Sequence, residues 1–220
     1  MSVSYRIVSK GGSRSFDAAH VFLDLADPAG EGLVFIGAEA GSAYQEAGDL
    51  SGRPFVAIEL DDECLAVHAG EDSGNVLGFA RFRMGKADPT SLIELVKHAG
   101  TAQSAIDAAK AAFEAAGLKV AVCGDFPGRI VNRLIRPYLN AALRRLDEGL
   151  ASAQDMDKTL CLGLGYPEGP IALLERTGLA EHYDVTQSLY LGLGQEAYAP
   201  ARRAQVAKAR ALRAPQWSGR

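Results

Sequence analysis

The chain has 220 residues, of which 48% are apolar, and a formal net charge of −4 at pH 7. This length holds one large domain or two small ones, and the apolar share is enough for a real core. The acidic balance argues against nucleic acid as a main partner, because phosphate binding requires a basic surface.

The apolar pattern and the cysteines predict a cytoplasmic protein that has no membrane span. No apolar run reaches about 18 residues, and the start MSVSYRIVSKGG lacks the features of a signal peptide. Cys64, Cys123 and Cys161 are scattered without metal-ligand spacing. We therefore expect unpaired thiols in a reducing compartment and no metal site.

Residues 1–124 are predicted to form an α/β domain. Apolar or alternating runs predict strands at 3–8, 33–36, 55–58, 64–67, 74–83, 92–96 and 119–122. Helices are expected at 16–26 and at 101–117, where Thr101 caps the second helix and Gly117 ends it. Strands that alternate with helices indicate a mainly parallel sheet.

Residues 125–220 are predicted to be helical throughout, which places a domain boundary near Gly124. Asp125 and Pro127 suit the first turn of a long helix, and regularly spaced apolar residues give that helix one wide buried stripe. Pro137 lies inside the pattern and is expected to kink the helix, because proline lacks a backbone donor.

Two further signals follow the long helix. Ser152 and Asp155 resemble a capping box at the start of a second helix. After Pro200 the chain is basic and rich in alanine, which predicts a surface helix that frays at Pro215. Contact of this tail with an acidic patch or with CoA phosphates is the alternative.

Residues 125–178 carry a series of short motifs. In chain order these are Asp125-x-Pro127-Gly128, Asn132-Arg133-Leu134, Asn140-Ala141, Glu148-Gly149, Asp155-Met156-Asp157, Gly163-x-Gly165-x-Pro167-x-Gly169-Pro170 and Gly178-Leu179. The series resembles the C-terminal helical domain of the NAD-linked 3-hydroxyacyl-CoA dehydrogenases. The resemblance implies a shortened, Rossmann-like α/β domain at 1–124 and a family-type helical domain at 125–220. It also implies a homodimer, an acyl-CoA ligand and NAD, with no metal.

The resemblance further implies an oxidoreductase of fatty acid metabolism that oxidises 3-hydroxyacyl-CoA to 3-oxoacyl-CoA. In this family a histidine is the base, a glutamate orients it, and an asparagine early in the long helix helps to bind the reacting oxygen. The asparagine matches Asn132 and the glutamate matches Glu94, although either could instead be structural. Ala80 stands at the position of the histidine. The histidines of this chain do not fit the family spacing: His20, His68, His98 and His182.

The features that would bind a dinucleotide are also degenerate. No G-x-G-x-x-G turn is present near the N-terminus, and the run 10–13 that follows the first strand lacks the third glycine. Residues 33–40 resemble the fourth strand of the family sheet, which implies that most of the first mononucleotide-binding unit is missing. Residues 59–62 replace the family's serine-asparagine-threonine loop with acidic residues, which should repel an anionic cofactor or CoA. NAD is thus a cofactor by resemblance only.

Three functions remain open on this basis. The first is a dehydrogenase of this family, impaired by the missing base and glycine turn. The second is a non-catalytic acyl-CoA-binding or dimerisation module that assists another enzyme. The third is an enzyme of different chemistry that uses Glu94 as its base. The intact loop 163–170 is expected to support helix packing and dimer contacts.

Overall fold

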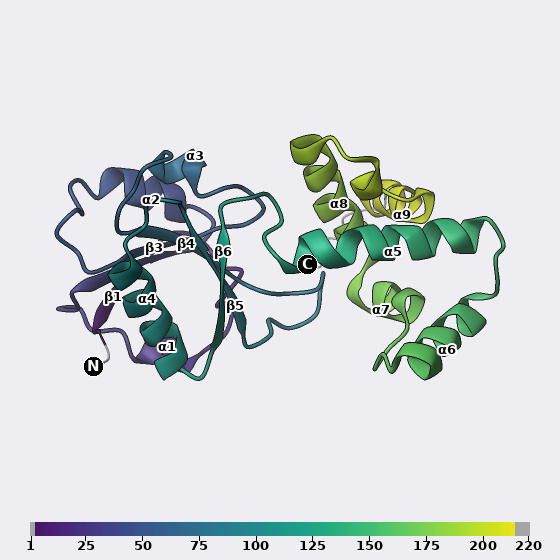
Figure 1. Ribbon diagram of the computed structural model, residues 1–220, viewed down its shortest axis with the longest axis horizontal. Helices are drawn as coiled ribbons and strands as arrows, with labels where there is room; N and C mark the ends of the chain where they lie inside the picture. The colour runs from purple at the N-terminus through teal and green to yellow at the C-terminus, as the bar shows by residue number, and fades with distance from the viewer. Residues whose placement is uncertain (1–2, 214–220) are drawn as a thin grey trace, which may run out of the picture. The chain divides into compact units, whose positions relative to one another are not determined.

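The computed structural model describes residues 3–213, which form two compact units (Figure 1). The first unit runs to Arg83 and continues from Asp88 to Ile130, and the second contains Met84–Ala87 and continues from Val131. The first is α/β and the second helical, which confirms the predicted fold class. The domain limits 1–124 and 125–220 stay a prediction, because the contacts divide the chain at Ile130.

The first unit is built on a six-stranded sheet whose strands lie in chain order. The strands are β1 (Tyr5–Ser9), β2 (Gly32–Ile36), β3 (Val56–Glu59), β4 (Val76–Arg81), β5 (Leu92–Lys97) and β6 (Lys119–Gly124). Strands β1 to β4 are parallel, β5 is antiparallel to β4, and β6 is parallel to β5. Every residue of β2 and β3 is buried, as expected for strands covered on both faces.

Four helices cover the two faces of this sheet (Figure 1). They are α1 (Val21–Asp24), α2 (Ala40–Glu46), α3 (Ala66–Ala69) and α4 (Gln103–Ala115). Helices α1 and α4 share one face, where the rings of Phe22 and Phe113 stack with their centroids 4.7 Å apart. Helices α2 and α3 pack on the other face, against Phe35 and Ile58 among others. Alternate residues of each strand therefore supply two separate cores.

The connections between the parallel strands lie on different faces. The connection from β1 to β2 contains α1 and crosses one face, whereas the next two contain α2 and α3 and cross the other. All three step in the same direction along the sheet, so the first has the opposite hand to the others. Such crossovers are right-handed in about 98% of cases, which makes the β1–β2 connection the exception. A dinucleotide-binding sheet has the strand order 3-2-1-4-5-6. If its second and third strands were lost, its first and fourth strands would be joined by a connection of this same unusual hand.

The second unit is a helical domain around one core. Its helices are α5 (Val131–Asp147), α6 (Ala153–Leu164), α7 (Pro170–Thr177), α8 (Leu179–Leu193), the 3-10 turn η1 (Glu196–Tyr198) and α9 (Arg202–Arg213). Leu139, Leu143 and Leu174 lie at the centre of the core. The predicted cap of α6 is confirmed, since the N–H of Asp155 donates to Ser152 Oγ at 3.1 Å.

Two details of the helical prediction have different outcomes. Pro137 lies inside the continuous helix α5, and the expected kink stays a prediction. The basic tail forms α9, as predicted, and it binds acidic groups: Arg203 pairs with Asp147 and Lys208 with Asp184, each at 2.7 Å. Pro215 lies outside the described residues.

Several expected elements of the first unit are wrong in type or extent. Residues 64–67 are not a strand but lead into α3, because the carboxylate of Asp125 accepts the N–H groups of Leu65 and Ala66 at 2.7 and 2.9 Å. Asp125 thus caps α3 rather than the long helix, which begins only at Val131.

Two helix boundaries in the first unit also differ from expectation. The helix expected at 16–26 is confined to Val21–Asp24, where His20 is the cap. Thr101 does not cap α4, because that helix begins at Gln103. The hydroxyl of Thr101 instead accepts a hydrogen bond from the N–H of His98 at 3.0 Å. Helix α2 was not expected at all.

Within residues 3–213, no helix combines the length and apolarity needed to cross a membrane. All three cysteines are unpaired. The same residues contain no cluster of three or more histidine, cysteine or carboxylate side chains that could hold a metal ion.

Candidate functional site

The antiparallel pair β4–β5 places Ala80 directly opposite Glu94. Both residues are buried, with 6% and 1% of their surface exposed. Directly opposed residues on one face of an antiparallel pair have Cβ atoms about 4.5–5.5 Å apart. A longer polar side chain at position 80 would therefore reach the carboxylate of Glu94, as the family's histidine–glutamate pair requires. The methyl group of Ala80 can neither accept nor donate a proton.

The carboxylate of Glu94 is bound by groups that follow β6. The N–H of Ile130 donates to Oε1 at 2.9 Å, and Nε of Arg129 lies 3.4 Å from Oε2. The Arg129 side chain is more than nine-tenths buried, and its backbone has a φ of +47°, which is uncommon for a residue with a side chain. A buried carboxylate needs such partners, because leaving it unpaired is costly. Glu94 is thus held in an internal ion pair.

Arg129 is the site residue that the sequence alone did not reveal. It follows Pro127-Gly128 of the recognised motif, but no periodicity or spacing pointed to it as the partner of Glu94. The two residues are 35 positions apart, and only the register of β5 against β6 brings them together. The Nη1 of Arg129 is buried without a hydrogen-bond partner in the described structure, so this cation has unused donor capacity.

Asn132 lies in the helical unit, at the second residue of α5, and is buried. Its side-chain oxygen accepts a hydrogen bond from Nε of Arg136 at 3.0 Å. A second nitrogen of Arg136 lies 2.9 Å from Nδ1 of His182, whose Nε2 lies 3.0 Å from the oxygen of Asn140. Since Asn140 offers an acceptor, Nε2 carries the proton and Nδ1 accepts from Arg136.

The electrostatics of this network keep His182 neutral. Burial and then the charge of Arg136 lower the pKa of His182 to about 3. The network fixes the orientation of the Asn132 amide: its oxygen is bound to Arg136, and its NH₂ group is the part that can donate to a ligand. This arrangement fits an oxygen-binding role for Asn132, which stays a prediction.

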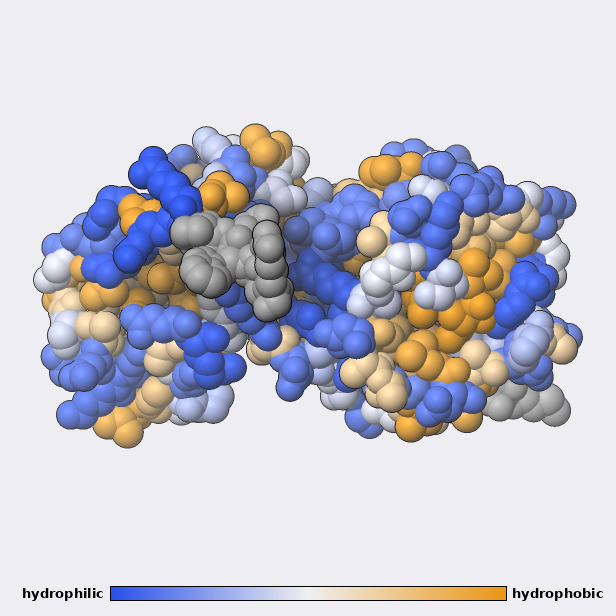
Figure 2. Space-filling view, turned by 180° about the vertical axis from the view of Figure 1, so that it is seen from behind, coloured by the Kyte–Doolittle hydropathy of each residue, from blue (hydrophilic) through white to orange (hydrophobic). Residues whose placement is uncertain are grey.

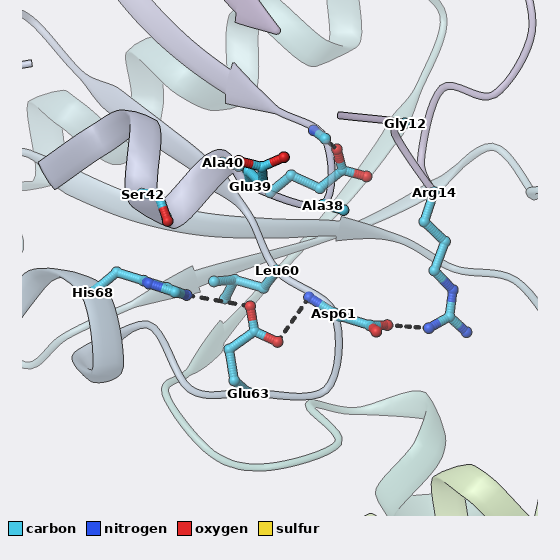
Figure 3. A pocket seen from close by; sticks show the side chains of 13 residues that line it. Gly12, Arg14, Ala38, Glu39, Ala40, Ser42, Leu60, Asp61, Glu63 and His68 are labelled. Carbon is cyan, nitrogen blue, oxygen red and sulfur yellow. Dashed lines mark hydrogen bonds and ion pairs between the residues drawn. The ribbon is translucent and has the colours of Figure 1, made fainter. Parts of the chain in front are cut away.

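A cavity of about 160 Å³ lies at the carboxyl ends of β1, β2 and β3 (Figure 3). Its walls include four carboxylates and two basic side chains: Glu39, Glu59, Asp61, Glu63, Arg14 and His68. Arg14 pairs with Asp61, and His68 Nε2 lies 3.2 Å from Glu63 Oε1. Both basic side chains thus already have a carboxylate partner in the wall, and the wall is acidic overall.

Each of the four histidines has a local structural partner. His20 accepts the N–H of Phe22, His68 pairs with Glu63, His98 contacts Ser73 at 3.0 Å and Asp125 at 3.5 Å, and His182 lies in the buried network described above. None of these contacts joins a histidine to Glu94.

Comparison with known proteins finds similarity mainly to the C-terminal part of the chain. Residues 128–218 match the family model described as "3-hydroxyacyl-CoA dehydrogenase, C-terminal domain". The 3-hydroxybutyryl-CoA dehydrogenase of Bradyrhizobium diazoefficiens is 35% identical over 109 residues, which are 50% of this chain and 37% of that protein. The human mitochondrial hydroxyacyl-coenzyme A dehydrogenase is 42% identical over 88 residues, 40% of this chain and 28% of its own length. The chain thus spans well under half of these curated relatives.

Solved structures support the fold over most of the chain. The (S)-3-hydroxybutyryl-CoA dehydrogenase of Ralstonia eutropha matches with a TM-score of 0.69 and 24% identity, covering 86% of this chain and 68% of that one. A diketoreductase matches with a TM-score of 0.67 and 15% identity, covering 96% of this chain and 93% of the diketoreductase chain. At these identities the likeness establishes a shared fold.

Proposed function

We propose, from the membership of residues 128–218 in the 3-hydroxyacyl-CoA dehydrogenase family, that this chain is an acyl-CoA-binding and dimerisation module. It does not complete the NAD-linked oxidation of 3-hydroxyacyl-CoA to 3-oxoacyl-CoA on its own. The observation that carries this proposal is the β4–β5 pair, where Ala80 lies opposite Glu94 and Arg129 binds Glu94.

The chemistry explains the weight of this observation. Oxidation of a secondary alcohol requires a base that takes the hydroxyl proton while hydride leaves the same carbon. A positioned base contributes about 10² to 10⁴ in rate, and Ala80 supplies none of it. Glu94 is a poor substitute, because both of its oxygens already accept from Ile130 and Arg129.

The residues at the carboxyl edge of the sheet do not fit NAD. A dinucleotide needs backbone N–H groups for its pyrophosphate and a crevice where the strand order reverses. Here the order of the strands is consecutive, and the cavity wall is acidic. The carboxylate of Glu59 already accepts the N–H groups of Ser15 and Gly37. When bound to a member of this family, NAD would supply the hydride acceptor.

The helical unit supports the dimer part of the proposal. Helix α6 buries none of its residues fully, and Leu162 on it is 79% exposed. An apolar groove of about 440 Å³ lies in the same unit, lined in part by Ile135, Tyr138, Tyr166 and Leu173. Figure 2 shows hydrophobic residues among hydrophilic ones on the surface of both units. A second copy of this chain is the occupant that we propose for α6 and the groove.

The dehydrogenase reaction itself is the second candidate function, and the geometry of Asn132 favours it. Its amide oxygen accepts from Arg136, so its NH₂ group is the part that would donate to an oxygen of the substrate. An acyl-CoA thioester or 3-oxo group would also accept from this amide without any redox step. The amide therefore supports ligand binding under either function.

One experiment separates the two functions. The purified chain is titrated with NADH while nicotinamide fluorescence is followed, and acetoacetyl-CoA is then added to monitor NADH consumption. We expect no fluorescence enhancement at micromolar NADH and no measurable turnover, together with a dimer in light scattering. Turnover above about 1 per second, an ordinary enzyme rate, would refute the non-oxidising proposal. A monomer without acetoacetyl-CoA affinity would refute the module.

A further inference from the structure

The loops that follow β1 and β2 are locked together at the carboxyl edge of the sheet. The N–H of Lys10 donates to Ile36 O at 3.0 Å, and the N–H of Ala38 donates to Gly12 O at 3.0 Å. Gly37 has a φ of +107°, and a Cβ there would lie 2.2 Å from Lys10 O. Only glycine allows this approach, so the two loops present their backbone groups in a fixed arrangement.

The side chain of Glu59 reaches these loops from the end of β3. Its Oε1 accepts from the N–H of Ser15 at 2.7 Å and from the hydroxyl of Ser13 at 3.0 Å. Its Oε2 accepts from the N–H of Gly37 at 2.6 Å. Glu59 is only 7% exposed, and it forms part of the cavity wall. Three donors from two loops thus converge on one buried carboxylate.

We propose that these three donors form an anion cradle, and that Glu59 fills it as an internal ligand in the place of a phosphate group. Two backbone N–H groups and a hydroxyl that point at one centre are the donor set that proteins use to bind phosphate oxygens. Carboxyl edges of parallel strands are also where dinucleotide-binding sheets hold their ligands. The cradle in this chain is closed to external anions, and removal of the Glu59 carboxylate opens it.

Glu59 in this position leaves no room in the cradle for a phosphate group of the family's cofactor. The glycine-rich turn is degenerate, but N–H groups that could meet a phosphate persist at Ser15 and Gly37. Their acceptor is now supplied by the chain itself, on a residue that adds a negative charge to the site. All residues of the cradle belong to the α/β unit, so the cradle is independent of acyl-CoA binding and of a dimer.

The test compares Glu59→Ala with a matched control, Glu39→Ala. Glu39 lies on the same cavity wall, but its side chain is mostly exposed and its nearest described cation is Lys10 Nζ at 3.8 Å. Binding of inorganic phosphate and of pyrophosphate is measured by calorimetry, and the Tm is followed with each anion. We expect Glu59→Ala to bind phosphate at least about tenfold more tightly than the wild type, since a charge-assisted hydrogen bond is worth about that factor. We expect no change for Glu39→Ala.

Two outcomes would overturn the proposal. One is a folded Glu59→Ala variant that shows no gain in affinity for phosphate or pyrophosphate. The other is a wild-type protein that binds these anions as tightly as Glu59→Ala does. If Glu59→Ala does not fold in plain buffer, the proposal requires that phosphate or acetate restores its folding, and failure of both anions would overturn it. Neither anion binding nor Tm is measured with NADH or acyl-CoA. The cradle proposal can therefore fail while the proposed function stands, and the reverse is also possible.

Discussion

Replacement of Ala80 by histidine tests the geometry on which the proposed function rests. The imidazole of Ala80→His would face Glu94 across the β4–β5 pair. It would compete there with Arg129, whose Nε lies 3.4 Å from the same carboxylate. Two cations beside one carboxylate repel each other, so the introduced histidine should stay neutral and unproductive. Ala80→His alone is therefore not expected to restore the family's base, whereas Ala80→His combined with Arg129→Met should re-form a histidine–glutamate pair.

The magnitudes follow from burial. Arg129→Met removes the cation from a carboxylate that is 1% exposed. Breaking a buried pair costs about 3–5 kcal/mol. The cost for Arg129→Met should lie at the lower end of this range, because the N–H of Ile130 still donates to Glu94 at 2.9 Å. Ala80→His alone should cost about 1–3 kcal/mol by overpacking a buried position. In the double variant the protonated imidazole replaces the guanidinium, so the two costs should not add, and about 1–2 kcal/mol should be recovered.

Denaturant unfolding of the wild type, both single variants and the double variant measures this coupling. The recovered stability should depend on pH, because Glu94 raises the folded-state pKa of the introduced histidine above its unfolded value of about 6.5. The gain should be fully present below about pH 6.5 and should be lost as the pH rises through the folded-state pKa. A strictly additive cycle at pH 6 would show that position 80 does not face Glu94, and the assignment of Ala80 to the base position would fall.

Three further predictions concern the helical unit. Because His182 has a folded pKa of about 3 against an ordinary 6.5, stability should fall as the pH drops from about 6.5 towards 3, and His182→Gln should flatten that part of the thermal unfolding profile. Asp157 accepts the N–H groups of Ile171 and Ala172 at 2.9 Å each, so Asp157→Ala should lower stability by about 1–2 kcal/mol in denaturant unfolding; an unchanged midpoint would contradict this cap. Leu162→Glu on α6 should convert the proposed dimer to a monomer in light scattering, whereas Leu191→Glu, at a similarly exposed position on α8, should leave that dimer intact.

The sequence was a good guide where local pattern and tertiary structure agree. The buried strands β2 and β3 were predicted because runs of apolar residues suit a sheet that is covered on both faces. The helical unit was predicted because its apolar residues recur at helical spacing and its caps use ordinary residue types. Ser152 needs only Asp155, three residues away, to act as a cap.

The sequence was a poor guide where a contact joins residues that are far apart in the chain. Helix α3 is four residues long, and its first turn is capped by Asp125, which follows it by 60 positions. Short helices of this kind depend on tertiary contacts, which no local periodicity reports. The same limit applies to the candidate site: Glu94 was identified from its match to the family's glutamate, but its partner Arg129 was not identified. Residues 59–62 were interpreted as a repelling acidic loop, whereas Glu59 turns inward and is bound by three donors.

Glu59 and Glu94 point to one interpretation of the α/β unit. In each case a polar group that could serve an external ligand is satisfied by another part of the chain: the N–H groups around Glu59 by its carboxylate, and Glu94 by Arg129. Internal partners of this kind keep buried polar groups paired without a cofactor, which is the condition for a stable fold. Removal of one partner leaves the other buried and unpaired, so a return to dehydrogenase chemistry requires coordinated changes at each place. The buried polar groups around Glu59 and Glu94 are therefore paired within the α/β unit itself, so variants that remove Glu59 or Arg129 should be less stable than the wild type.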